Sequence, residues 1–136
     1  MKPLCRRGYR TVMQFTLEKA GTAHIINDYG ASCVTIQTRT YRNSLCISPH
    51  EILEDWQHPP PQAITIKEFA TMCTWRPELL LLGTGERHVF VQPAIIAALH
   101  QQGIALEVMT TPAACRTYNV LVSERRKVAA ALMLGD

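Results

Sequence analysis

The sequence predicts a single three-layer α/β domain with a central mixed sheet, and three observations lead to this class. The N-terminal third contains short alternating stretches between turn-forming residues, a pattern typical of antiparallel strands. The second half contains two apolar runs, at residues 79–82 and 104–109, which are typical of buried parallel strands. The chain has 136 residues, of which 47% are hydrophobic and 18% are charged, and these values suit one globular domain.

Charge is distributed unevenly along the chain. Residues 1–12 contain Lys2, Arg6, Arg7 and Arg10 and no acidic residue, so the remaining residues carry ten of the 14 basic and all 11 acidic side chains. We expect residues 1–12 to form a basic, disordered tail and residues 13–136 to form the α/β domain. Because this domain is close to neutral, it lacks the basic face of a nucleic-acid-binding module, and no nucleic-acid partner is expected.

The N-terminal third predicts an antiparallel meander. Strands are expected at residues 12–18, 32–38 and 44–47, with turns at 27–30 and 41–43.

Two capping boxes predict two helices after the meander. Residues 48–51 read Ser-Pro-His-Glu, which places proline at the first helical position of a helix that extends to about Trp56. The proline run 58–61 then predicts a rigid, extended connection. Residues 65–68 form the second capping box, and the helix that follows is expected to end before Pro77.

The second half predicts a βαβαβ arrangement. The run 79–82 ends in a Gly-Thr-Gly turn, and a helix at 93–101 leads to the strand 104–109. These elements predict a βαβ unit, whose crossover should be right-handed. Thr111 is expected to cap a further helix that begins at Pro112. Residues 127–134 predict a last buried strand, although their alanines leave a helix as the alternative.

Three segments carry a resemblance to a known family. Residues 77–86, 109–121 and 124–126 resemble a domain-of-unknown-function family of small α/β proteins that includes mitochondrial complex I assembly factor 3. The resemblance covers about residues 13–134. It implies a three-layer fold with a mixed sheet, no established enzymatic activity, and a role in assembling a membrane respiratory complex through protein contacts. The family usually has glycine where this chain has Arg125, so we expect a slightly different turn there.

The predicted topology brings several polar residues to one edge of the sheet. Parallel sheets bind ligands beyond the carboxyl ends of their strands, and a helix N-terminus offers free N–H groups to an anion. The candidate ligand or interaction site therefore comprises Gly83, Thr84, Gly85, Glu86, Arg87, Thr111, Cys115, Arg116, Thr117 and Asn119. The glycine loop matches neither G-x-G-x-x-G nor a P-loop, so a structural turn is the favoured interpretation and a ligand loop the alternative.

Several of these residues have a structural interpretation beside the functional one. Cys115 lies near a helix N-terminus and next to Arg116, so it could be a reactive thiolate with His88 as its base. Burial of Cys115 in the core is the favoured interpretation. Arg116, Thr117 and Asn119 could face a ligand, or could fix the helix to neighbouring loops by hydrogen bonds to the backbone.

These patterns favour a non-enzymatic protein-interaction or assembly-factor domain with an unidentified protein partner. The resemblance implies that such a partner would associate the chain indirectly with a membrane complex. The alternative is a small-molecule or anion-binding domain, or an undescribed enzyme, with its site at the ends of strands 79–83 and 104–109. No cofactor is expected, and no metal, because the five cysteines and five histidines lack zinc-site spacing. Without an apolar leader or membrane span the chain is expected in the cytoplasm, or in mitochondria if its basic N-terminus is a presequence remnant.

Overall fold

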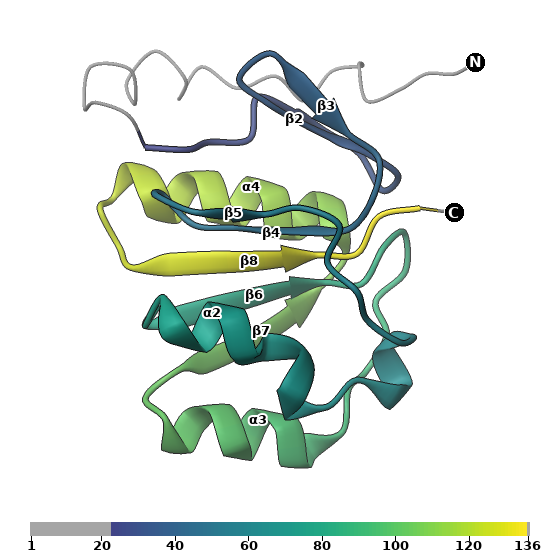
Figure 1. Cartoon of the computed structure of the whole chain (residues 1–136), viewed down its shortest axis with the longest axis vertical. Coiled ribbons are helices and arrows are strands. Elements are labelled where there is room, and N and C mark those ends of the chain that lie inside the picture. The colour runs from purple at the N-terminus through teal and green to yellow at the C-terminus, as the bar shows by residue number, and fades with distance from the viewer. Residues whose placement is uncertain (1–22, 136) are drawn as a thin grey trace.

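The computed structural model describes residues 23–135 as a three-layer α/β arrangement (Figure 1). The central sheet has five strands in the order β5-β4-β8-β6-β7. Their bounds are Leu45–Ile47 for β4, Ile52–Leu53 for β5, Leu79–Gly83 for β6, Ala105–Met109 for β7 and Val128–Leu132 for β8. Strand β6 pairs in parallel with β7 and β8, whereas β4 pairs antiparallel with β5 and β8. The predicted mixed sheet is therefore confirmed. The strand expected at 12–18 and the basic tail lie outside the described residues.

A second, antiparallel sheet contains β1 (Asp28–Tyr29), β2 (Val34–Ile36) and β3 (Arg39–Tyr41). The turn expected at 27–30 is wrong, because Asp28 and Tyr29 pair with β2. The turn lies just beyond, where the N–H of Gly30 donates to the carbonyl of Cys33 at 3.0 Å. Tyr29 is buried, so its packing outweighs the turn preference of its polar neighbours. The predicted turn at 41–43 likewise begins one residue too early, because Tyr41 ends β3.

The first capping box closes a hairpin and starts no helix, so the helix expected at 49–56 is wrong. The hydroxyl of Ser48 accepts from the N–H of Glu51 at 3.0 Å and donates to its carboxylate, as in a cap. However, the N–H of Ser48 also donates to the carbonyl of Glu51 at 2.9 Å, and β5 then pairs with β4. Strand pairing satisfies the backbone here, so the helix does not form.

The described residues contain the 3₁₀ turns η1 (Pro61–Ala63) and η2 (Ile66–Phe69), and the α-helices α2 (Ala70–Thr74), α3 (Pro93–Gln101) and α4 (Thr111–Ser123). No helical turn was predicted at 61–63, whereas the other four begin and end close to their predicted positions. The second capping box is present, with Glu68 accepting from the N–H of Thr65 at 2.8 Å. Residues 128–132 form a strand, which excludes the helix that their alanines also allowed.

The central sheet separates two hydrophobic cores. On one face, Leu81, Ala130 and Leu132 pack with α4 and with residues of β1 and β2. On the other face, Leu80, Leu82 and Ala131 pack with η2, α2 and α3. Figure 1 shows α4 and the small sheet on one side of β8 and β6, and α2 and α3 on the other. Alternation along β6 and β8 thus supplies both cores, as expected for strands buried on both faces.

Candidate functional site

The start of α4 is bonded to the loop that follows β6. The N–H of Gly85 donates to the hydroxyl of Thr111 at 2.8 Å, and the N–H of Thr111 donates to the carbonyl of Gly85 at 2.8 Å. The same hydroxyl donates to the carbonyl of Met133 at 2.7 Å. The sequence predicted Thr111 as the N-cap of α4, and this prediction is wrong. Thr110 is the N-cap, and its hydroxyl accepts from the N–H of Ala113 at 3.4 Å.

The rest of this loop satisfies its own polar groups. The N–H of Thr84 donates to the carbonyl of Met109 at 2.9 Å, and its hydroxyl donates to the carbonyl of Arg87 at 2.6 Å. A Cβ atom at Gly83 would lie 2.8 Å from Cα and Oγ1 of Thr111, so glycine allows the contact. Glu86 and the Arg87 side chain are exposed. This edge brings Gly83, Thr84, Gly85 and Thr111 together in direct backbone contact.

Cys115 is fully buried on the α4 side of the sheet. Burial raises the pKa of its thiol far above the ordinary range, and the neighbouring charge of Arg116 offsets only part of this effect. Arg116 itself is exposed. His88 is also exposed, and its ring packs edge-on against Phe90 with the centroids 4.7 Å apart. The burial of Cys115 and the exposure of Arg116 and His88 favour the interpretation of Cys115 as a core residue.

Asn119 joins α4 to the segment before β1. Its side-chain oxygen accepts from the N–H of Ile26 at 2.9 Å, and its side-chain nitrogen donates to the carbonyl of the same residue at 2.8 Å. Both residues are buried. One residue earlier, the hydroxyl of Tyr118 donates to the carbonyl of His24 at 2.8 Å. The side chains of Tyr118 and Asn119 therefore bind the backbone of residues 24–26. Thr117, which precedes them on α4, is half-buried.

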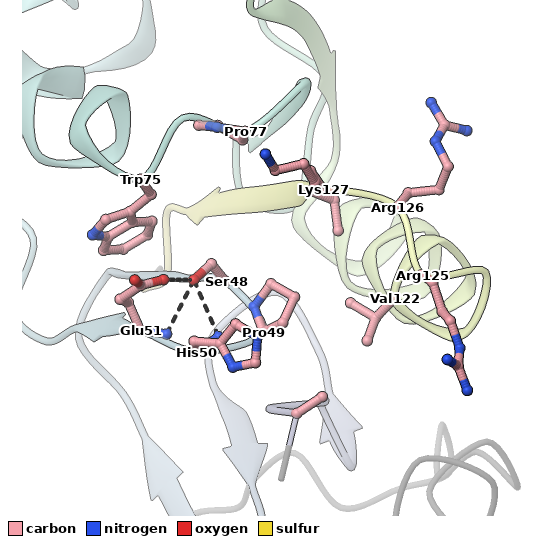
Figure 2. A pocket seen from close by; sticks show the side chains of 12 residues that line it. Ser48, Pro49, His50, Glu51, Trp75, Pro77, Val122, Arg125, Arg126 and Lys127 are labelled. Atoms are coloured by element: carbon pink, nitrogen blue, oxygen red, sulfur yellow. Dashed lines mark hydrogen bonds between the residues drawn. The ribbon is translucent and has the colours of Figure 1, made fainter. Parts of the chain in front are cut away.

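A cavity of about 410 Å³ lies at the opposite end of the sheet. It is formed by the β4–β5 turn, the connection from α2 to β6, and the connection from α4 to β8 (Figure 2). We call it the basic cavity, and its lining residues are Ala23, Ser48, Pro49, His50, Glu51, Trp75, Pro77, Val122, Arg125, Arg126, Lys127 and Val128. The sequence interpretation missed this cavity. Its only signal was the run of three basic residues at 125–127.

The connection from α4 to β8 has the geometry of a glycine-capped helix end. Arg125 has a φ of 62°, in the left-handed region that glycine usually occupies. Its N–H donates to the carbonyl of Val122 at 2.9 Å, and the N–H of Arg126 donates to the carbonyl of Leu121 at 3.0 Å. This is the Schellman pattern. The expectation of a different turn at Arg125 is therefore wrong, because the arginine adopts the same conformation as glycine.

The architecture defines the class as a small three-layer α/β domain built on a mixed sheet of five strands. Residues 26–133 match the family described as protein of unknown function (DUF498/DUF598). The chain belongs to this family.

Relatives support this assignment in sequence and in structure. A human protein named NADH dehydrogenase (ubiquinone) 1 alpha subcomplex assembly factor 3 is 32% identical over 126 residues, which cover 91% of this chain and 68% of that protein. A crystal structure from Bordetella parapertussis is 29% identical with a TM-score of 0.78, and the match covers 85% of this chain and 99% of that one. A solution structure from Xanthomonas campestris is 34% identical with a TM-score of 0.75, and the match covers 82% and 85%.

Two further properties concern residues 23–135 alone. Within that range, no helix combines the length and apolar character required to cross a membrane. The same residues contain no group of three or more His, Cys, Asp or Glu side chains arranged to hold a metal ion.

Proposed function

We propose that the chain is a non-enzymatic interaction domain that assists the assembly of a respiratory NADH dehydrogenase. The observation that carries this proposal is the likeness to the human assembly factor, which extends over 91% of the chain. The bonded contact between the Gly83–Gly85 loop and Thr111 supports the absence of catalysis at that edge. The proposal places the chain in the cytoplasm, where it meets the membrane enzyme through a protein partner.

Two exposed apolar side chains, on neighbouring elements of the chain, are the positions through which we propose this contact. The side chain of Phe90 is 80% exposed on the loop between β6 and α3, and that of Ile96 is 42% exposed on α3. Aromatic side chains contribute strongly to protein interfaces, and an exposed phenylalanine gains free energy when a partner covers it. We call Phe90 and Ile96 the contact pair.

Photo-crosslinking in living cells tests the proposal. A photoreactive phenylalanine analogue at position 90 should crosslink to subunits or assembly intermediates of NADH dehydrogenase. Position 120 is the control, because Val120 is as exposed as Ile96, at 42%, but lies on α4 across the sheet.

The same cells provide the functional readout. Removal of the chain should reduce assembled NADH dehydrogenase on native gels, and Phe90→Ser combined with Ile96→Ser should reproduce that loss. Normal enzyme assembly without the chain, or crosslinks to unrelated proteins from both positions, would contradict the proposal.

A further inference from the structure

We propose that the basic cavity binds a small organic anion with a flat apolar body, such as an aryl carboxylate or an aryl phosphate. The cavity has a volume of about 410 Å³, within the range of small-molecule sites. Its three walls come from segments far apart in the sequence. None of its lining residues belongs to the contact pair, so this inference and the proposed function are tested separately.

Part of the wall is apolar and suits a flat ring. Trp75 is half-buried and packs on the core that contains α2 and α3, so its indole is held in place from behind. Figure 2 shows the indole directed toward the Ser48 and Glu51 side of the cavity. The other apolar lining residues are Ala23, Pro49, Pro77, Val122 and Val128. An aryl group placed here would be removed from water and could stack on the indole.

Positive charge accumulates at the same cavity. Arg125, Arg126 and Lys127 line it, whereas residues 13–136 as a whole carry a net charge of −1. Across residues 23–135, the one salt bridge joins Arg39 to Glu54, so none of the three cavity bases is neutralised by an ion pair there. Such a concentration of unpaired positive charge favours an anion.

The three basic side chains differ in direction, and only that of Lys127 turns toward another lining residue. Figure 2 shows its ammonium directed toward Pro77, whereas the side chains of Arg125 and Arg126 extend outward at the rim. Glu51, the acidic lining residue, already accepts a hydrogen bond from the hydroxyl of Ser48. We therefore assign the anionic group of the ligand to Lys127, with the two arginines adding longer-range attraction.

The backbone around Lys127 is fixed before any ligand arrives. Its carbonyl accepts from the N–H groups of Glu78 and Leu79, at 2.8 and 3.2 Å. The Schellman bonds of Arg125 and Arg126 fix the residues immediately before it. A preformed site loses little conformational entropy on binding, so even a small ligand can bind measurably.

A titration with matched probes tests the inference. The probes are 2-naphthoate, its neutral analogue 2-naphthamide, and inorganic phosphate, which has charge but no apolar body. The indole N–H signals of the two tryptophans report binding in ¹⁵N NMR spectra. Trp75 lines the cavity, whereas Trp56 is buried and donates its indole N–H to the carbonyl of Glu68, so Trp56 is the internal control.

We expect 2-naphthoate to shift the Trp75 signal saturably at millimolar or lower concentration, and to leave the Trp56 signal unchanged. The neutral amide and phosphate should bind at least several-fold more weakly. Lys127→Met keeps most of the aliphatic stem and should weaken naphthoate binding about tenfold, the loss expected for one charge-assisted hydrogen bond. Lys67→Met, at an exposed lysine on η2, should bind naphthoate as the wild type does.

Three results would overturn the inference. The first is equal affinity for the acid and the amide, and the second is equal affinity of the Lys127 and Lys67 variants for naphthoate. The third is the absence of a saturable Trp75 shift in the wild-type protein. Unchanged Trp56 signals in both variants would show that they are folded, so a negative result could not be attributed to unfolding.

Discussion

Asn119 shows how one side chain can take the place of a strand. Its amide offers one acceptor and one donor to the N–H and carbonyl of Ile26, which is the pairing that a neighbouring strand would supply. Asparagine is unfavourable inside a helix, so its presence at 119 indicated a specific partner. The sequence interpretation allowed such a hydrogen bond to the backbone but could not identify Ile26, which lies 93 residues away.

Asn119→Ala should reduce the free energy of unfolding by about 2–4 kcal/mol, because it leaves two buried backbone groups without a partner. Urea denaturation measures the change. Asn43→Ala is the control, since the amide of Asn43 bonds the exposed carboxylate of Asp55 and its loss should cost less than about 1 kcal/mol. Equal losses in the two variants would contradict this account of Asn119.

Cys115 should react with an alkylating reagent only after unfolding, because its thiol is fully buried and burial raises its pKa. Cys73 is partly exposed and should react first in the folded protein, although burial also raises its pKa. Mass spectrometry of iodoacetamide-treated protein at neutral pH, with and without denaturant, measures the labelling of each of these two cysteines. Rapid labelling of Cys115 in the native protein would restore the idea of a nucleophile.

His24 should make the protein less stable in mild acid. Burial, together with nearby His50, lowers its pKa, and its Nδ1 atom is buried without a hydrogen-bond partner. Since the unfolded chain then binds a proton at higher pH than the folded one, stability is complete above about pH 6.5 and decreases as the pH falls below that value. His24→Gln should show a smaller difference between urea denaturation at about pH 7.5 and about pH 5.5. The same difference in wild type and variant would contradict this role.

At the scale of elements, two similar sequence signals lead to different structures. Residues 48–51 and 65–68 both match a capping box, but only 65–68 forms both of its reciprocal bonds. In 48–51 the Ser48 hydroxyl accepts from the N–H of Glu51, whereas the N–H of Ser48 donates to the Glu51 backbone carbonyl. Only the second begins a helix. After residue 51 the chain pairs with β4 and Trp56 is buried, so tertiary contacts decide the outcome. The pattern of residues 48–51 could not reveal this outcome, because the residues that pair with β5 and that contact Trp56 lie outside those four positions.

The contact between Gly83 and Thr111 should not tolerate a methyl group. Gly83→Ala would place Cβ 2.8 Å from Cα of Thr111, and we expect a loss of about 1–3 kcal/mol from overpacking. Gly30→Ala is the matched control, since no atom lies within 4 Å of its added Cβ. Thermal unfolding of the two variants measures the difference. A stable Gly83→Ala protein would mean that the loop can move away from α4.

At the scale of the whole molecule, the sequence predicted the second half of the fold better than the first. Its apolar runs identified β6, which is buried on both faces, and β7, which is an edge strand with Ala105 and Glu107 exposed. The small sheet has strands of two or three residues, and such short segments carry little periodic signal. The basic cavity could not be predicted, because its walls come from three segments that only the folded chain brings together.

Hydrogen exchange should differ between the central sheet and the small antiparallel sheet. Amides of β6 and β8 in the middle of the sheet should exchange most slowly, because each strand is paired on both sides and covered by a core on both faces. Amides of β1 to β3 should exchange faster, because these strands are short and β3 is largely exposed. Exchange measured by NMR checks the order. Equal protection in both sheets would indicate that they open as one unit.

The central position of β8 has a consequence for synthesis on the ribosome. Strands β4 and β6 do not pair with each other, and β8, at Val128–Leu132, joins them. Until those residues leave the ribosomal tunnel, both strands have an unpaired apolar edge, although β4 is made more than 80 residues earlier. The sheet must therefore close late, only after residues 128–132 have been made. The nascent protein should depend on protection from aggregation during that interval.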